Sequence, residues 1–211
     1  MLNGHEFGTM PAAYVGGLGL EGTLALKQYT EQGGTLIALD EASDFVIDQF
    51  GLPVRNAVAG LSSDDFFIPG SLIQMKVDTQ HPLAYGMQPV AAAAFVRSRA
   101  FANVELSVEG EGGRADLKPT LVIPTETIAE YSNHHLLLSG WALGEAQYIG
   151  GHAAMMRVKL GGGNVILTGF RPQFRGQARG TYKLLFNTLY AATLSQWPER
   201  ATDEPRESAG H

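Results

Sequence analysis

The sequence has no cysteine among its 211 residues. Disulfides, thiolate metal sites and cysteine nucleophiles are therefore excluded at once. The cellular compartment stays open, because many secreted bacterial proteins also lack cysteine. No stretch approaches the roughly 20 consecutive apolar residues of a membrane-spanning helix.

Basic residues are fewer than acidic ones, with 15 lysines and arginines against 21 aspartates and glutamates. The formal net charge of −6 argues against nucleic acid as a general partner. It does not exclude a small anionic ligand, because the arginines cluster locally.

Glycine is abundant, at 26 residues against an average share of roughly 7%. This predicts many tight corners between strands and helices. A chain of this length suits one domain with a sizeable core. We expect a single α/β domain over residues 1–197 and a polar, disordered tail over residues 198–211.

Residues 164–194 carry the clearest pattern in the chain. An apolar run from Val165 to Leu167 predicts a strand buried on both faces, as in a parallel sheet. From Thr181 onward apolar residues recur at helical spacing, which predicts an amphipathic helix capped by Thr181 or Gly180. Residues 153–160 alternate and, through a glycine turn, form a predicted hairpin with residues 164–169.

Between that strand and helix lies a basic loop with Arg171, Arg175 and Arg179 at intervals of four residues. One interpretation is structural: the arginines pair with carboxylates of neighbouring loops and hold the corner. The other is a site for a carboxylate or phosphate at the carboxyl edge of the sheet. Gln173 and Thr181 complete the ligand-binding candidates of this loop. The loop lacks the lysine spacing of a phosphate-binding loop.

A helix–strand–helix unit is predicted earlier in the chain. Residues 21–31 form the first helix, with Leu24, Leu26 and Tyr29 as its apolar members, and Gly33 and Gly34 end it. Residues 35–39 form a short buried strand, and a second helix runs to about Phe50. Residues 1–22 contain no strand, which is unusual for the start of an α/β domain.

The corner after residues 35–39 joins the predicted strand to the second helix, and Ser43 is the hydroxyl available there as a candidate nucleophile. His81, His134 and His135 are the candidate bases. A serine near a helix start is more often a cap, and no G-x-S-x-G elbow surrounds Ser43.

Two further side chains have both a structural and a functional interpretation. His81 precedes Pro82 in a turn, where its imidazole caps a backbone group or faces a ligand. Trp141 belongs to the core or forms an aromatic platform, and the core is favoured. The histidines show no H-x-x-E pair, so we expect neither a metal site nor a cofactor.

Several blocks of the sequence, taken together, resemble one known family. They are PAAYVGGLGLEGTLALKQYTEQGGTLIALDEASDF (11–45), FFIPGSL (66–72), HPLAYGM (81–87), LLSGWALGE (137–145) and GFRPQFRGQARGTYKLLFN (169–187). Together they resemble the accessory domain that follows the catalytic module of bacterial zinc-carboxypeptidase-like proteins. That domain is similar in fold to the class I glutamine amidotransferases, a flavodoxin-like α/β layer. The resemblance spans residues 11–197.

The resemblance implies a mostly parallel central sheet with a C-terminal β-hairpin, and a domain that lacks its first strands. It implies a secreted or periplasmic parent protein in which a metallopeptidase-like domain adjoins this one. With no cysteine nucleophile, we expect a non-catalytic accessory or binding domain. The alternatives are an anion-binding domain that uses the arginine loop and a cryptic serine hydrolase on Ser43. An open sheet edge beside residues 35–39 would favour self-association.

Overall fold

The computed structural model describes residues 4–6, 8–12, 15–104, 123–176, 178–198 and 200. The predicted polar tail, residues 198–211, lies outside this part of the chain except for Pro198 and Arg200. No helix within the described ranges has both the length and the apolarity needed to cross a membrane.

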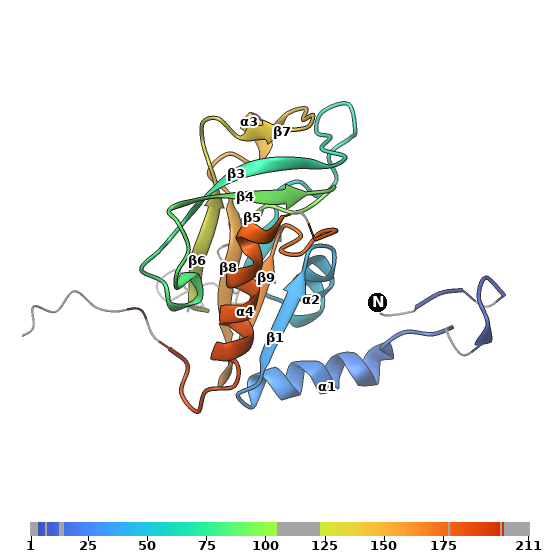
Figure 1. The fold of residues 1–211 in the computed structure, drawn as a ribbon. Coiled ribbons are helices and arrows are strands. Elements are labelled where there is room, and N and C mark those ends of the chain that lie inside the picture. Colours follow the sequence, from blue (N-terminus) through green and yellow to red (C-terminus); the bar gives the residue numbers. More distant parts are fainter. Residues whose placement is uncertain are drawn as a thin grey trace, which may run out of the picture.

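Figure 1 shows the elements in chain order around a twisted sheet. The helices are α1 (Gly19–Glu31), α2 (Ala42–Phe50), α3 (Glu145–Tyr148) and α4 (Tyr182–Ala191), with 3-10 turns η2 (Pro82–Ala84) and η3 (Arg179–Thr181). The strands are β1 (Thr35–Leu39), β2 (Val54–Asn56), β3 (Ser71–Val77), β4 (Val90–Phe95), β5 (Phe101–Asn103), β6 (Thr125–Tyr131), β7 (Leu137–Ser139), β8 (Ala153–Leu160) and β9 (Gly163–Thr168).

The sheet has nine strands, and its main path runs β1-β9-β8-β6-β3-β4. The predicted α/β class is confirmed, as is the hairpin of β8 and β9. The sheet is nevertheless mostly antiparallel, and the described strands pair in parallel only between β1 and β9. The expectation of a mostly parallel sheet was wrong because short turns such as the one between β8 and β9 reverse the chain, whereas parallel neighbours need a long crossover.

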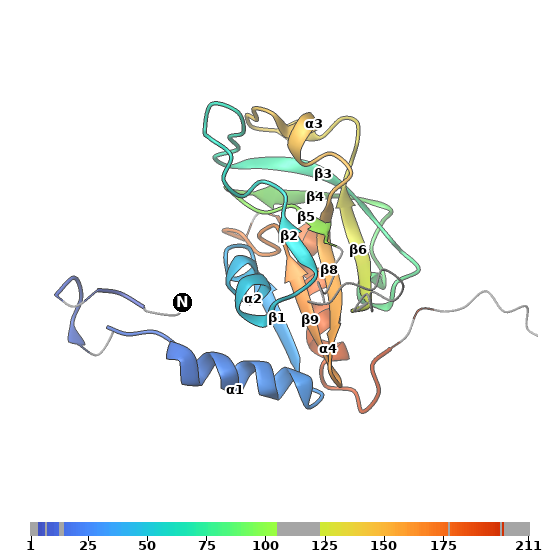
Figure 2. The same ribbon diagram turned by 180° about the vertical axis from the view of Figure 1, so that it is seen from behind.

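Helices cover both faces of the sheet around β9. Val165 and Leu167 pack against α2 in one cluster, while Ile166 packs with Leu83 of η2 and Leu184 of α4 in the other. Successive side chains of a strand point to opposite faces, so β9 serves both clusters. Figure 2 shows α2 on the side of the sheet opposite α4. All six residues of β9 are buried, as the sequence predicted.

The turn between β8 and β9 is packed against the end of α1. A Cβ at Gly163 would stand 2.1 Å from the carbonyl oxygen of Thr30, and one at Gly161 would stand 2.7 Å from that of Glu31. Gly161 also has φ +59°, a conformation that favours glycine. These glycines let the hairpin turn contact the α1–β1 corner directly, which fixes β1 beside β9.

Candidate functional site

The corner between β1 and α2 lies at the carboxyl end of the parallel strand pair, where open α/β sheets place their ligands. Asp40 occupies it with φ +51°, in the left-handed region. Aspartate enters this region more readily than most residues because its short polar side chain bonds locally. The corner residue is therefore Asp40, and Ser43 lies three positions further on, inside α2.

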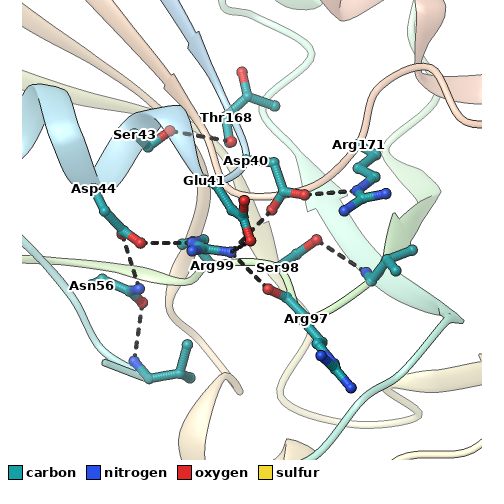
Figure 3. Close-up of polar contacts among 12 residues, drawn as sticks. Asp40, Glu41, Ser43, Asp44, Asn56, Arg97, Ser98, Arg99, Thr168 and Arg171 are labelled. Atoms are coloured by element: carbon teal, nitrogen blue, oxygen red, sulfur yellow. Dashed lines mark hydrogen bonds and ion pairs between the residues drawn. The ribbon is translucent and has the colours of Figure 1, made fainter. Parts of the chain in front are cut away.

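Two arginines hold the carboxylate of Asp40 (Figure 3). Arg171 donates from Nε to Oδ2 at 2.8 Å, and Nη1 of Arg99 stands 3.7 Å from Oδ1. The Asp40 side chain is only 10% exposed. Its Oδ1 is buried and accepts no hydrogen bond from the described residues. Burying a carboxylate costs free energy, and the two arginines offset that cost.

Arg99 also joins this corner to the first turn of α2. Its Nε donates to Oδ2 of Asp44 at 2.8 Å, and its Nη1 donates to the main-chain oxygen of Arg97 at 2.7 Å. Glu41 lies 3.8 Å from the same Nη1. Sequence patterns did not predict this role, because Arg99 lies in a loop far along the chain from Asp40 and belongs to no motif.

Tyr131 on β6 approaches the cluster from within the sheet. Its hydroxyl donates to the main-chain oxygen of Arg99 at 2.8 Å. Burial raises the pKa of Tyr131 well above its ordinary value, and the negative charge of Asp40 raises it further. The phenol therefore stays neutral and supports the loop that carries Arg99.

Within the described ranges, Ser43 has no general base beside its hydroxyl. The side chain is fully buried, and Oγ hydrogen-bonds to the main-chain oxygens of Ala38 at 3.3 Å and Thr168 at 3.4 Å. His81 is the N-cap of η2, which packs with α4 on the opposite face of the sheet from α2. His134 and His135 are exposed between β6 and β7. The sequence placed Ser43 near the corner but did not reveal that it points inward.

His81 forms the cap that its structural interpretation predicted. Its Nδ1 accepts from the main-chain N–H of Leu83 at 3.1 Å, so Nε2 carries the proton and donates to Glu126 at 3.1 Å. Arg157 donates from Nη1 to both carboxylate oxygens of Glu126 at 3.0 Å each. These contacts link η2 to β6 and β8 and leave no ring nitrogen of His81 for a ligand.

Glu126 makes the stability of this fold depend on pH in the acid range. Burial raises its pKa, but the hydrogen bonds from His81 and Arg157 and the positive charge of Arg157 lower it below the ordinary 4.5. The stabilising free energy from Glu126 is fully present above the pKa that the carboxyl has in the unfolded chain. It is lost as the pH falls through the lower pKa that the carboxyl has in the folded chain. Because the side chain is 46% exposed, we expect it to be worth less than about 1 kcal/mol.

The measurement is a set of urea midpoints from about pH 3 to pH 7 for the wild-type chain and for Glu126→Gln. The variant should show a shallower loss of stability on acidification. Glu21→Gln, an exposed residue of α1, is the matched control and should follow the wild type. If the urea midpoints of Glu126→Gln and of the wild type fall equally steeply as the pH is lowered, the prediction is contradicted.

The three arginines of the loop do not form one site. Arg171 is ion-paired with Asp40. Arg175 lines a hollow of about 470 Å³ together with Phe174, Ser71 and Gly140. Arg179 lines an adjoining hollow of about 440 Å³ beside Lys183, and Leu72 and Ala178 line both hollows. Arg171 and Arg175 share one neighbour, because both guanidinium groups lie over the ring of Phe174, at 5.5 and 5.1 Å from its centre.

The remaining candidates are placed as follows. Thr181 is buried and donates from Oγ1 to the main-chain oxygen of Pro172 at 2.7 Å, and its side chain does not cap α4. Gln173 is exposed. Trp141 is 53% exposed and packs edge-on against Phe67, so the core interpretation was wrong. The hydroxyl of Ser71, at the start of β3, donates to the main-chain oxygen of Trp141 and accepts from its main-chain N–H. No described helix or strand covers the indole ring there.

The titratable residues do not assemble a metal centre in the described part of the chain. No group of three or more histidine, aspartate or glutamate side chains gathers there in a way that could hold an ion. The ion cluster at Asp40 has basic partners on its carboxylates instead.

No protein-family profile matches the sequence, and a search of curated proteins finds no match. Solved structures that are similar to parts of this chain include β-galactosidase from Bacillus circulans sp. alkalophilus, with TM-score 0.49 and 11% identity over 81% of this chain and 20% of that one. They include a ThuA-like protein from Bacteroides uniformis, with TM-score 0.41 and 13% identity over 80% and 62%. Cytoplasmic protein STM3548 from Salmonella typhimurium gives TM-score 0.44 and 13% identity over 80% and 59%. The chain spans less than two thirds of each of these proteins.

Proposed function

We propose that this chain is a non-catalytic domain with an amidotransferase-like fold, which acts as a binding or stabilising module. The observation that carries the proposal is the occupant of the β1–α2 corner. A nucleophile at such a corner must be exposed to substrate and lie beside a general base. Asp40 is instead 10% exposed and ion-paired with two arginines.

The proposed setting is a longer parent chain in which a metallopeptidase-like domain adjoins this one. The support for it is the resemblance of the sequence blocks within residues 11–187 to the accessory domains of zinc-carboxypeptidase-like proteins. Fold and family supply no site by themselves, so the function rests on the corner geometry and not on the resemblance.

The test is turnover and active-site labelling of the purified chain. We expect no hydrolysis of glutamine or of activated esters, and no labelling by a fluorophosphonate, because the Ser43 hydroxyl is buried against main-chain oxygens. Turnover that is abolished by Ser43→Ala or Asp40→Asn would overturn the proposal. Ser62→Ala, which changes an exposed serine, is the control for non-specific labelling.

A second candidate function is the binding of a small carboxylate, such as a peptide end or a sugar acid. The observation that favours it is Arg175, which lines the 470 Å³ hollow and forms no ion pair with the described residues. Its guanidinium stands 5.1 Å from the ring centre of Phe174. An arginine stacked on an aromatic face and open to a hollow suits bidentate contact with a carboxylate.

Isothermal titration with N-acetyl amino acids and glucuronate tests this candidate. Arg175→Ala should weaken binding by about tenfold or more, the loss expected for one charge-assisted contact. Arg55→Ala removes an exposed arginine on β2 and should leave the affinity unchanged. Absence of heat with every ligand would reject anion binding at this hollow without affecting the non-catalytic proposal.

A further inference from the structure

Two hollows on the outer face of the β3–β4 pair join into one groove. The hollow of about 470 Å³ lies beside Ala94 and Val96, and the hollow of about 440 Å³ lies beside residues 90–92 of β4. Leu72 and Ala178 line both hollows, so the two hollows meet at these residues. The segment that begins α4 forms one wall of the groove, and Figure 1 shows the start of α4 below β4.

Three cationic side chains border this groove. Arg175 lines one hollow, and Arg179 and Lys183 line the other. Neither arginine forms an ion pair with the described residues. Lys183 donates from Nζ to the main-chain oxygen of Gly86 at 2.6 Å. An ammonium group has three donors, so this bond holds Lys183 at the rim and leaves it able to donate to a ligand.

The charge of the groove is opposite to that of the whole chain. The formal net charge is −6, yet no aspartate or glutamate of the described residues lines either hollow. Cations gathered in a concave surface, with no carboxylates among them, raise the local concentration of anions. The groove therefore favours an anionic ligand.

Arg175 is held at the groove by a strained backbone. Its φ is +51°, a left-handed conformation that is uncommon for a long side chain. Its guanidinium lies 5.1 Å from the ring centre of Phe174, which lines the same hollow. Strain of this kind persists mostly where a side chain serves a ligand, and an arginine stacked on a ring keeps its fork of donors free for a carboxylate.

The surface between the cations is apolar and sets the length of the ligand. The side chain of Leu72, 37% exposed, lies where the two hollows meet. The centres of the hollows lie about four residues apart along β4, which is roughly 13 Å at about 3.3 Å per residue. One carboxylate therefore contacts the cations of one hollow only. A ligand that uses both hollows carries an anionic group at each end and an apolar chain between them.

We propose that this groove binds an elongated dicarboxylate. One carboxylate pairs with Arg175, the other pairs with Arg179 and Lys183, and the aliphatic chain lies over Leu72. A saturated chain of about ten carbons fits the spacing, because it advances by about 1.25 Å per bond. The inference rests on the second candidate function, carboxylate binding at Arg175, and adds to it a second anion site and the class of ligand.

The test is isothermal titration of the full chain with three acids. Sebacate has ten carbons and a carboxylate at each end, decanoate has the same length and one carboxylate, and succinate has two carboxylates on a chain too short to reach both hollows. Sebacate should bind at least about tenfold more tightly than either of the others, because its second carboxylate binds at a high effective concentration once the first is held.

Variants of the protein assign the two ends of the ligand. Arg175→Ala and Arg179→Ala should each weaken sebacate binding by about tenfold or more. Succinate contacts one hollow at a time, so neither substitution should change its affinity as much. Arg55→Ala removes an exposed arginine of β2, outside the groove, and should bind sebacate as the wild type does.

A further pair of variants tests the apolar middle of the groove. Leu72→Gln should weaken sebacate binding by about fivefold, because the aliphatic chain loses its apolar contact. It should leave succinate binding unchanged. Leu189→Gln makes the same substitution at a 46% exposed leucine of α4 that lines neither hollow, and is the matched control.

Equal affinities for sebacate and decanoate would overturn the inference, as would sebacate binding that Arg179→Ala leaves unchanged. In either case carboxylate binding at Arg175 survives if Arg175→Ala still weakens it, so the two proposals fail separately. Absence of heat with all three acids would also overturn the inference. The second candidate function is then decided by its own titrations with N-acetyl amino acids and glucuronate.

Discussion

Asp40→Ala should lower the free energy of unfolding by about 3 kcal/mol. The substitution removes the one carboxylate that contacts both Arg171 and Arg99, and it leaves the Arg99 side chain, 16% exposed, without this partner. Removing one member of a buried ion pair costs more than the pair itself is worth, because the remaining charge has lost its compensation. Urea unfolding followed by circular dichroism measures the change.

Two controls separate the effect of losing the Asp40 carboxylate from the effect of backbone strain at position 40. Glu41→Ala removes a neighbouring carboxylate whose side chain is 76% exposed, and should change stability by no more than about 0.5 kcal/mol. Asp40→Gly removes the same carboxylate but accepts φ +51° without strain, so it should be less destabilising than Asp40→Ala by about 1 kcal/mol. If Asp40→Ala unfolds at the wild-type midpoint, the ion cluster does not hold this corner.

Phe170→Ala should have a comparable or larger effect, a loss of about 3–5 kcal/mol. The ring is fully buried between β9 and the arginine loop and belongs to the cluster that contains Leu184 of α4. Truncation removes the transfer free energy of the ring and leaves a cavity that the closely paired strands around it fill only in part. The same urea experiment measures it.

Phe186→Ala is the matched control for this prediction. It makes the same substitution on α4, at a ring that is 52% exposed, and should stay within about 0.5 kcal/mol of the wild type. Because Phe170 directly precedes Arg171, the double variant Phe170→Ala with Asp40→Ala should lose less than the sum of the two single losses. Additive losses would show that the ring does not help to position Arg171.

The sequence predicted the elements that have a strong local pattern. β1 and β8 have the predicted bounds, and the hairpin of β8 and β9 follows from its glycine turn. His81 could be predicted as a cap because Pro82 fixes the backbone next to it. In each case the determining interactions lie within a few residues along the chain.

The site could not be predicted in the same way. Asp40 and Ser43 lie in one short segment, and only the backbone conformation at the corner shows that Asp40 takes the strained position while Ser43 turns inward. Arg99 joins the cluster from a distant loop. Of the apolar residues named for the first helix, Leu26 packs against the core, whereas Leu24 and Tyr29 are exposed.

The sequence by itself determined the α/β class, the buried strand before the arginine loop and the absence of a thiol nucleophile, because these depend on composition and on short-range pattern. The tertiary structure decided the direction of strand pairing, the ion pair of Arg171 with Asp40 and the inward turn of Ser43. These depend on which distant segments meet: Arg171 is bound because β1 brings Asp40 beside it, and nothing near Arg171 in the chain specifies that contact.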